Sequence, residues 1–157
     1  MTAPAEEGGT AGGDRSHPVL AMATLVVPDY DAGIAFFCGE LGWTLVHDSD
    51  EGRKRWVVVS PAGPGPSGAR LLLARADTDA QRAAVGTQTG DRVAFFLETD
   101  DFDRDVATIR MSSARLLEHP RQESYGRVVK WQDPFGNRWD LLEPRQGARL
   151  SSGSDRG

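Results

Sequence analysis

Two carboxylates, Glu98 and Asp140, lie in apolar segments of this sequence that have the pattern of β-strands. Side chains alternate between the two faces of a strand, so Ala94, Phe96 and Glu98 share one face. If that face lines a cavity, Glu98 and Asp140 can both point into it. Two such carboxylates would hold Mg²⁺ or Mn²⁺ weakly, together with water. Without a metal, partial burial would favour the protonated form of one carboxyl group, which could then act as a general acid or base.

The other side chains with reactive groups give little support for a metal site or a nucleophile. His17 lies in the N-terminal tail, and His47 and His119 lie at the ends of predicted strands, where solvated polar residues are the usual case. The single cysteine, Cys38, excludes an intrachain disulfide. Cys38 lies in a helical segment with no histidine close in sequence, which favours a small packing residue over a nucleophile.

A short sequence pattern occurs twice, 72 positions apart. Residues 27–31 precede one apolar helical segment and residues 99–103 precede another. The matched pairs are Asp29 with Asp101, Tyr30 with Phe102, Asp31 with Asp103, Ile34 with Val106 and Ala35 with Ala107. Two copies with so long a period indicate one duplicated supersecondary unit within a domain, not a solenoid array. A functional cleft is expected where the two halves meet.

Both copies predict the same order of elements, βαβββ, with the three consecutive strands in an antiparallel meander. The first unit spans residues 19–75 and the second spans residues 91–144. The predicted strands are 19–27, 43–47, 55–60, 70–74, 92–99, 115–118, 126–132 and 138–143. Predicted helices follow Pro28, connect the units over 78–85, and cover 102–111. Residues 133–137 predict a turn.

The composition bounds the class of protein. Of the 157 residues, 39% are hydrophobic and 26% are charged, which is typical of a globular domain. Residues 1–17 and 146–157 have the composition of disordered tails, which leaves 18–145 as the folded part. The net charge of -5 argues against nucleic-acid binding. Because no apolar run could span a membrane and the N-terminus lacks a signal-peptide pattern, we expect a cytoplasmic protein, and the Gly-, Ala- and Arg-rich composition suits a bacterial source.

The paired βαβββ unit resembles the vicinal oxygen chelate superfamily, which includes glyoxalase I, extradiol dioxygenases, fosfomycin-resistance proteins and bleomycin-binding proteins. The resemblance rests on the pattern D-x-x-x-x-I/V-A at each helix start, at residues 29–35 and 101–107, and on D-P-x-G-N at residues 133–137. It covers about residues 20–144. It implies an α+β fold in which two βαβββ repeats form a curled mixed β-sheet around a cavity, with helices outside. It also implies a homodimer.

The resemblance further implies where a metal would be held, on the first and last strands of each unit. The corresponding first-strand residues are Met22 and Ala94, neither of which suits a hard metal ion. The last strand of the second unit offers Asp140, whereas that of the first unit offers only an aliphatic residue within 71–73. One ligand-capable position in four is too few for a stable site, so we expect no metal cofactor, although a divalent metal on Glu98 and Asp140 stays an alternative.

The residues expected to face the cavity are mainly apolar. They are Met22, Thr24, Ala94, Phe96, Glu98, Asp140 and Leu142, with Trp56, Tyr125, Arg127 and Trp131 as further walls. Such a lining suits a hydrophobic or aromatic small molecule. Three functions follow: a metal-independent enzyme of isomerase, cyclase or lyase type using Asp140 or Glu98; a protein that sequesters an antibiotic; and a metal-dependent dioxygenase or lyase with nonstandard ligands.

Overall fold

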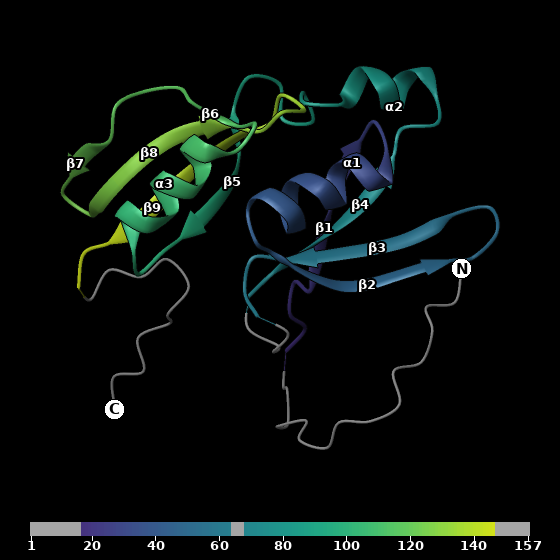
Figure 1. Cartoon of the computed structure of the whole chain (residues 1–157), viewed down its shortest axis with the longest axis horizontal. Coiled ribbons are helices and arrows are strands. Elements are labelled where there is room, and N and C mark those ends of the chain that lie inside the picture. Colours follow the sequence, from purple (N-terminus) through teal and green to yellow (C-terminus); the bar gives the residue numbers. More distant parts are fainter. Residues whose placement is uncertain (1–16, 64–67, 147–157) are drawn as a thin grey trace.

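A computed structural model describes residues 17–63 and 68–146 of the chain. It contains two βαβββ units, each with its own mixed sheet and its own helix against that sheet (Figure 1). The α+β fold class and the duplication predicted from the sequence are therefore confirmed. The expected tails, 1–17 and 146–157, lie almost entirely outside the described residues.

The first unit forms a four-stranded sheet in the order β1-β4-β3-β2. Its strands are β1 (Met22–Val27), β2 (Thr44–Asp50), β3 (Arg55–Ser60) and β4 (Arg70–Arg75). Strand β1 runs parallel to β4, and the other neighbours are antiparallel. The helix between β1 and β2 begins as α1 (Tyr30–Ile34) and continues as the π-helical segment η1 (Ala35–Glu40).

The second unit repeats this arrangement, with strand order β5-β9-β8-β6. Its strands are β5 (Val93–Glu98), β6 (Arg115–Leu116), β7 (Arg121–Glu123), β8 (Gly126–Gln132) and β9 (Arg138–Pro144). Helix α3 (Phe102–Met111) lies against the sheet, and α2 (Asp79–Ala84) lies in the connection between the units (Figure 1). Strand β7 also pairs with β8 and was not predicted.

The repeated aspartates begin the two helices. Asp29 accepts a hydrogen bond from the backbone N–H of Ala32 at 3.0 Å, and Asp101 accepts one from Arg104 at 3.1 Å. Each carboxylate thus satisfies a backbone donor that the first helical turn leaves free. The 72-residue repeat is in part a repeat of helix caps.

One hydrophobic core joins the two units. In the first unit, β1, β3 and β4 direct Leu25, Val59 and Leu73 into it, and the second unit adds side chains of α3, β8 and β9. Phe37 of η1 lies 6.0 Å from the ring of Trp139, and Phe36 lies 6.5 Å from Trp131, measured between ring centroids. Side chains on the opposite face of each sheet therefore point away from this shared core.

Candidate functional site

The register of the second sheet places the predicted carboxylates on one strand face. In the parallel pair of β5 and β9, Phe96 lies opposite Asp140 and Glu98 lies opposite Leu142. Because alternate residues share a face, all four side chains lie on the face away from the shared core. We call this the Phe96 face; it is defined by Phe96, Glu98, Asp140 and Leu142, together with Lys130 and Val128 of β8.

Asp140 has a cationic partner that the sequence did not reveal. The Nζ of Lys130 lies 3.3 Å from Oδ1 of Asp140, and the two side chains are 30% and 15% exposed. Lys130 is opposite Asp140 in the antiparallel pair of β8 and β9. Cross-strand pairs of opposite charge stabilise a sheet, so this carboxylate is already engaged within the protein. Predicting this pair from the sequence would require the register of β8 against β9, which places Lys130 opposite Asp140.

Phe96 is the main exposed aromatic residue of this face. It is 61% exposed although it lies in the middle of a strand. Ala94, two residues before it, is half-buried. An aromatic side chain exposed in the middle of a strand is available for contact with a ligand or with a second protein chain.

The matching face of the first sheet carries the other predicted residues. Met22 and Thr24 lie opposite Arg70 and Leu72 in the β1–β4 pair. Thr24 is exposed, and Met22 is half-buried. Trp56, also half-buried, lies opposite Ser49 of β2. These side chains point away from the shared core as Phe96 does, but from the other unit.

Two predicted wall residues lie elsewhere. Trp131 is 0% exposed and stacks on Trp139 with ring centroids 5.0 Å apart, so it lies in the shared core and not on the Phe96 face. Arg127 also lies on the helix side, where it pairs with Asp103 and Glu143, each at 3.2 Å. Arg127 and Trp131 are each an odd number of residues from Lys130 along β8. Their side chains therefore lie on the opposite face of the strand from Lys130, and not on the Phe96 face.

Tyr125 lies in the turn between β7 and β8 and is 45% exposed. Its backbone carbonyl accepts a hydrogen bond from the N–H of Arg145 at 2.8 Å, which fixes the turn against the end of β9. Its side chain is thus open to solvent at one end of the second sheet.

The residues at the expected metal positions do not fit a divalent cation. Thr24 pairs with Leu72 in the first unit as Phe96 pairs with Asp140 in the second, so Leu72 takes the position of the second carboxylate. Together with Met22 and Ala94, this donor set offers one carboxylate, and that group faces Lys130. Within residues 17–63 and 68–146, no group of three or more His, Cys, Asp and Glu is placed to hold a metal ion.

Cys38 packs against the shared core, and burial raises the pKa of its thiol. A thiol with a raised pKa is a poor nucleophile at neutral pH. This placement agrees with a packing role. Among the described residues, none of the helices is long and apolar enough to cross a membrane.

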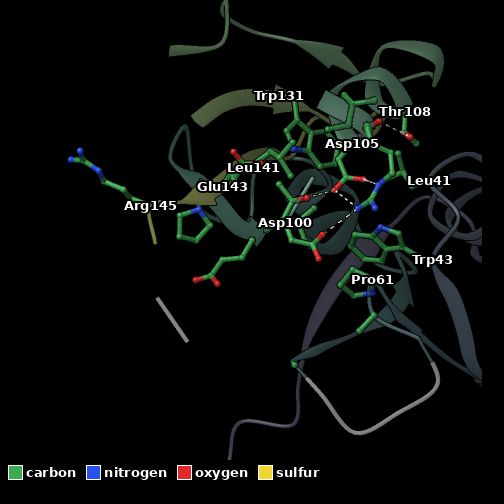
Figure 2. Close-up of a pocket in the computed structure, with 18 of the residues that line it drawn as sticks. Leu41, Trp43, Pro61, Asp100, Asp105, Thr108, Trp131, Leu141, Glu143 and Arg145 are labelled. Carbon is green, nitrogen blue, oxygen red and sulfur yellow. Dashed lines mark hydrogen bonds and ion pairs between the residues drawn. The ribbon is translucent and has the colours of Figure 1, made fainter. Parts of the chain in front are cut away.

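A hollow lies on the helix side, between the two units (Figure 2). Its volume is about 1110 Å³, and Leu41 and Trp43 of the first unit face Ile109 and Leu141 of the second across it. The duplication predicted a cleft where the two halves meet, but it did not predict these lining residues, because they come from segments that meet only when the two units pack together.

Comparisons with known proteins agree with this architecture. The family model described as "Glyoxalase/Bleomycin resistance protein/Dioxygenase superfamily" matches residues 19–141. An uncharacterized protein of Shewanella frigidimarina is 44% identical over 126 residues, which are 79% of this chain and 92% of that protein.

Two solved structures have a similar fold. The crystal structure of UcmS2 has a TM-score of 0.70 at 20% identity and covers 81% of this chain and 98% of its own. TnmS3, an antibiotic binding protein from Streptomyces sp. CB03234, has a TM-score of 0.65 at 22% identity and covers 83% of this chain and 99% of its own.

Proposed function

Because the chain belongs to the glyoxalase/bleomycin resistance protein/dioxygenase superfamily, we propose that it is a cytoplasmic protein that binds and sequesters a hydrophobic, aromatic small molecule on the Phe96 face, without a metal. The observation that carries this proposal is the 61% exposure of Phe96 in the middle of a strand. Covering such a side chain contributes about 1.5–3 kcal/mol to binding. TnmS3, a structural relative, is an antibiotic binding protein, which is consistent with this function.

The charges of the face favour capture over chemistry. Asp140 is held by Lys130 at 3.3 Å, so the pair presents a neutral polar contact beside Phe96. An apolar wall with few oriented polar groups is the usual lining of a small-molecule site. A ligand would stack on Phe96 and place its polar groups near Lys130.

A second copy of the chain would complete the site. Each unit leaves one sheet face pointing away from the shared core, so a face carrying Phe96 in one copy can lie against a face carrying Thr24 and Trp56 in the other. The ligand would then lie in a cavity at the interface of a homodimer. Sedimentation velocity tests this step: Phe96→Glu should shift the protein from dimer to monomer, and a wild-type monomer at all concentrations would refute it.

The binding test uses 8-anilinonaphthalene-1-sulfonate, an aromatic anion that suits Phe96 and Lys130. Its fluorescence titration should give a dissociation constant about tenfold weaker for Phe96→Ala than for the wild type. The matched control is Met111→Ala, since Met111 is 90% exposed but lies at the end of α3. Equal weakening in both variants would mean that the dye binds exposed apolar residues in general, which would count against the proposal.

A metal-independent enzyme is the second candidate, because Glu98 and Asp140 lie on the same face as Phe96. One of the carboxyl groups would abstract a proton beside a carbonyl group. Deuterium incorporation into 2-tetralone, followed by NMR in D₂O, tests this reaction class. Exchange that disappears in Asp140→Asn, while the dye still binds, would support an enzyme; exchange that persists would exclude Asp140 as the base.

A further inference from the structure

The hollow between the two units, which we call the inter-unit pocket, lies on the opposite side of the second sheet from Phe96. Its apolar walls are Leu41, Trp43 and Pro61 from the first unit and Leu97, Ile109 and Leu141 from the second. Leu141 belongs to the shared core, whereas Phe96 points away from that core. With a volume of about 1110 Å³, the pocket has room for a molecule of drug size.

The inner wall of the pocket holds a buried hydrogen-bond donor without a partner. Trp131 lines the pocket and is 0% exposed, and its Nε1–H makes no hydrogen bond to any described residue. Trp139, which stacks on it, donates its own Nε1–H to Asp133 at 3.0 Å. Buried polar groups are nearly always hydrogen-bonded, so the indole N–H of Trp131 requires an acceptor that the described residues do not supply.

The rim of the pocket is acidic. The carboxylates of Asp100, Asp105 and Glu143 line it together with two guanidinium groups, and Glu98 borders it at the end of β5. Asp105 is engaged by Thr99 and by Arg104, at 2.5 Å and 3.0 Å. Asp100 is 85% exposed and lies 3.7 Å from Arg104 (Figure 2). Glu143 is paired with Arg127, so the exposed carboxylate of Asp100 is the group that favours a cation at the mouth of the pocket.

We propose that the inter-unit pocket is a second small-molecule site, which takes a planar aromatic ligand with a carbonyl acceptor at one end and a protonated amine at the other. The carbonyl oxygen accepts the Trp131 Nε1–H, the ring lies between Trp43 and Ile109, and the amine lies near Asp100. Reaching the indole N–H requires a small outward shift of the side chains above it. This site is independent of the one on the Phe96 face.

The first test observes the donor itself. In a ¹H–¹⁵N spectrum the four tryptophans give four indole signals, and Trp131→Phe identifies the one that belongs to Trp131. The probe is N-(2-dimethylaminoethyl)-1,8-naphthalimide, which carries imide carbonyls and an amine. The Trp131 signal should shift downfield and its exchange with solvent should slow as the probe is added. If it stays unchanged at saturation, a buried water satisfies the donor and the proposal is overturned.

The second test measures affinity by the fluorescence of the probe. Trp131→Phe keeps most of the ring but removes the N–H, and should weaken binding about five- to tenfold. Asp100→Asn should weaken binding of the amine probe about two- to threefold but leave N-butyl-1,8-naphthalimide, which has no amine, unaffected. Asp91→Asn, an equal change of charge outside the pocket lining, is the matched control.

Phe96→Ala separates the two sites. It should leave naphthalimide binding unchanged while it weakens binding of the anilinonaphthalene dye. If Phe96→Ala weakens both ligands equally, the inter-unit pocket is not a separate site. If Trp131→Phe leaves naphthalimide affinity unchanged, the indole N–H takes no part in binding.

Discussion

Arg127 lies over the ring of Phe102, with its guanidinium carbon 4.6 Å from the ring centroid. Arg55, 72 positions earlier, lies 5.8 Å from the ring of Tyr30 in the same manner. Each arginine also pairs with the aspartate that follows its aromatic residue along the helix, at 3.2 Å and 2.7 Å. The duplication therefore repeats a contact between a strand and a helix start, and this contact is a structural role for Arg127.

Replacing Arg127 tests that role. Arg127→Ala should lower the free energy of unfolding by about 1–2 kcal/mol, because it loses a cation–π contact and two partly exposed ion pairs. Arg127→Lys should recover only part of the loss, since an ammonium group lacks the planar fork. Urea denaturation measures both.

Arg53→Ala is the control for this prediction, because Arg53 is exposed in the turn between β2 and β3. It should change stability by less than about 0.5 kcal/mol. If Arg127→Ala leaves stability intact but abolishes dye binding, Arg127 belongs to a ligand site after all.

The sequence predicted much of the fold because its local signals agree with one another. Alternating apolar residues predicted the strands, and the capping aspartates marked both helix starts. Alternation alone also placed Phe96 and Glu98 on one face, and the register then put Asp140 beside them. These features depend on short stretches of chain, which is why they can be derived without an alignment.

The facing of β8 could not be derived in the same way. Val128 is 2% exposed and Val129 is 0% exposed, so both faces of this strand are apolar and alternation does not distinguish them. The sequence therefore left open which way Arg127 and Trp131 face, and the structure places both on the helix side. The duplication predicted a cleft between the two halves, but it did not predict the residues of the inter-unit pocket. The walls of this pocket belong to separate units, and periodicity carries no information about how units pack.

The buried carboxylate of Asp133 should contribute strongly to the stability of the second unit. It is 3% exposed, and its carboxylate accepts hydrogen bonds from the backbone N–H groups of Phe135 and Asn137 and from the side chains of Asn137 and Trp139, all at 2.9–3.0 Å. In Asp133→Asn an amide nitrogen would face two of these donors. We expect a loss of about 2–4 kcal/mol in unfolding free energy at neutral pH, measured by urea denaturation.

The size of that loss should depend on pH. Burial raises the pKa of Asp133, although hydrogen bonds from Trp139 and Asn137 oppose the shift. The folded state therefore takes up the proton more readily than the unfolded chain. Protonation of Asp133 therefore contributes to the free energy of unfolding. This contribution is fully present below the pKa that Asp133 has in the unfolded chain, roughly 4, and it is lost as pH rises through the pKa that Asp133 has in the folded state. Asparagine does not titrate, so the difference in unfolding free energy between the wild type and Asp133→Asn should become smaller as pH rises.

Asp91→Asn is the matched control for the pH series, because Asp91 is exposed. The difference in unfolding free energy between Asp91→Asn and the wild type should stay constant within error over the same pH range. If the difference in unfolding free energy between the wild type and Asp133→Asn grows with rising pH, the pKa of Asp133 is not raised in the folded state.

Gln88 should protect the free edge of β1. Its side-chain oxygen accepts a hydrogen bond from the backbone N–H of Val26 at 2.7 Å, and its side-chain nitrogen donates one to the carbonyl of Thr24 at 3.1 Å. The amide thus pairs with β1 as a neighbouring strand would. Gln88→Ala should speed hydrogen exchange of the Val26 amide and lower stability by about 1 kcal/mol. Gln122→Ala removes a side chain that donates to the adjacent Glu123 carbonyl at 3.2 Å, and it should leave exchange of the Val26 amide unchanged.

Gly86 should be required where the connection between the units passes the turn at residues 133–137. Its φ is 74°, and a Cβ atom there would lie 2.2 Å from the carbonyl oxygen of Phe135. Gly86→Ala should therefore cost about 1–2 kcal/mol for the left-handed backbone and about 1–3 kcal/mol more for the clash. Gly90→Ala has a similar φ of 68° but open space around the new methyl group, so it should show only the first cost. Equal losses in the two variants, measured by urea denaturation, would mean that the connection does not pack closely against the turn.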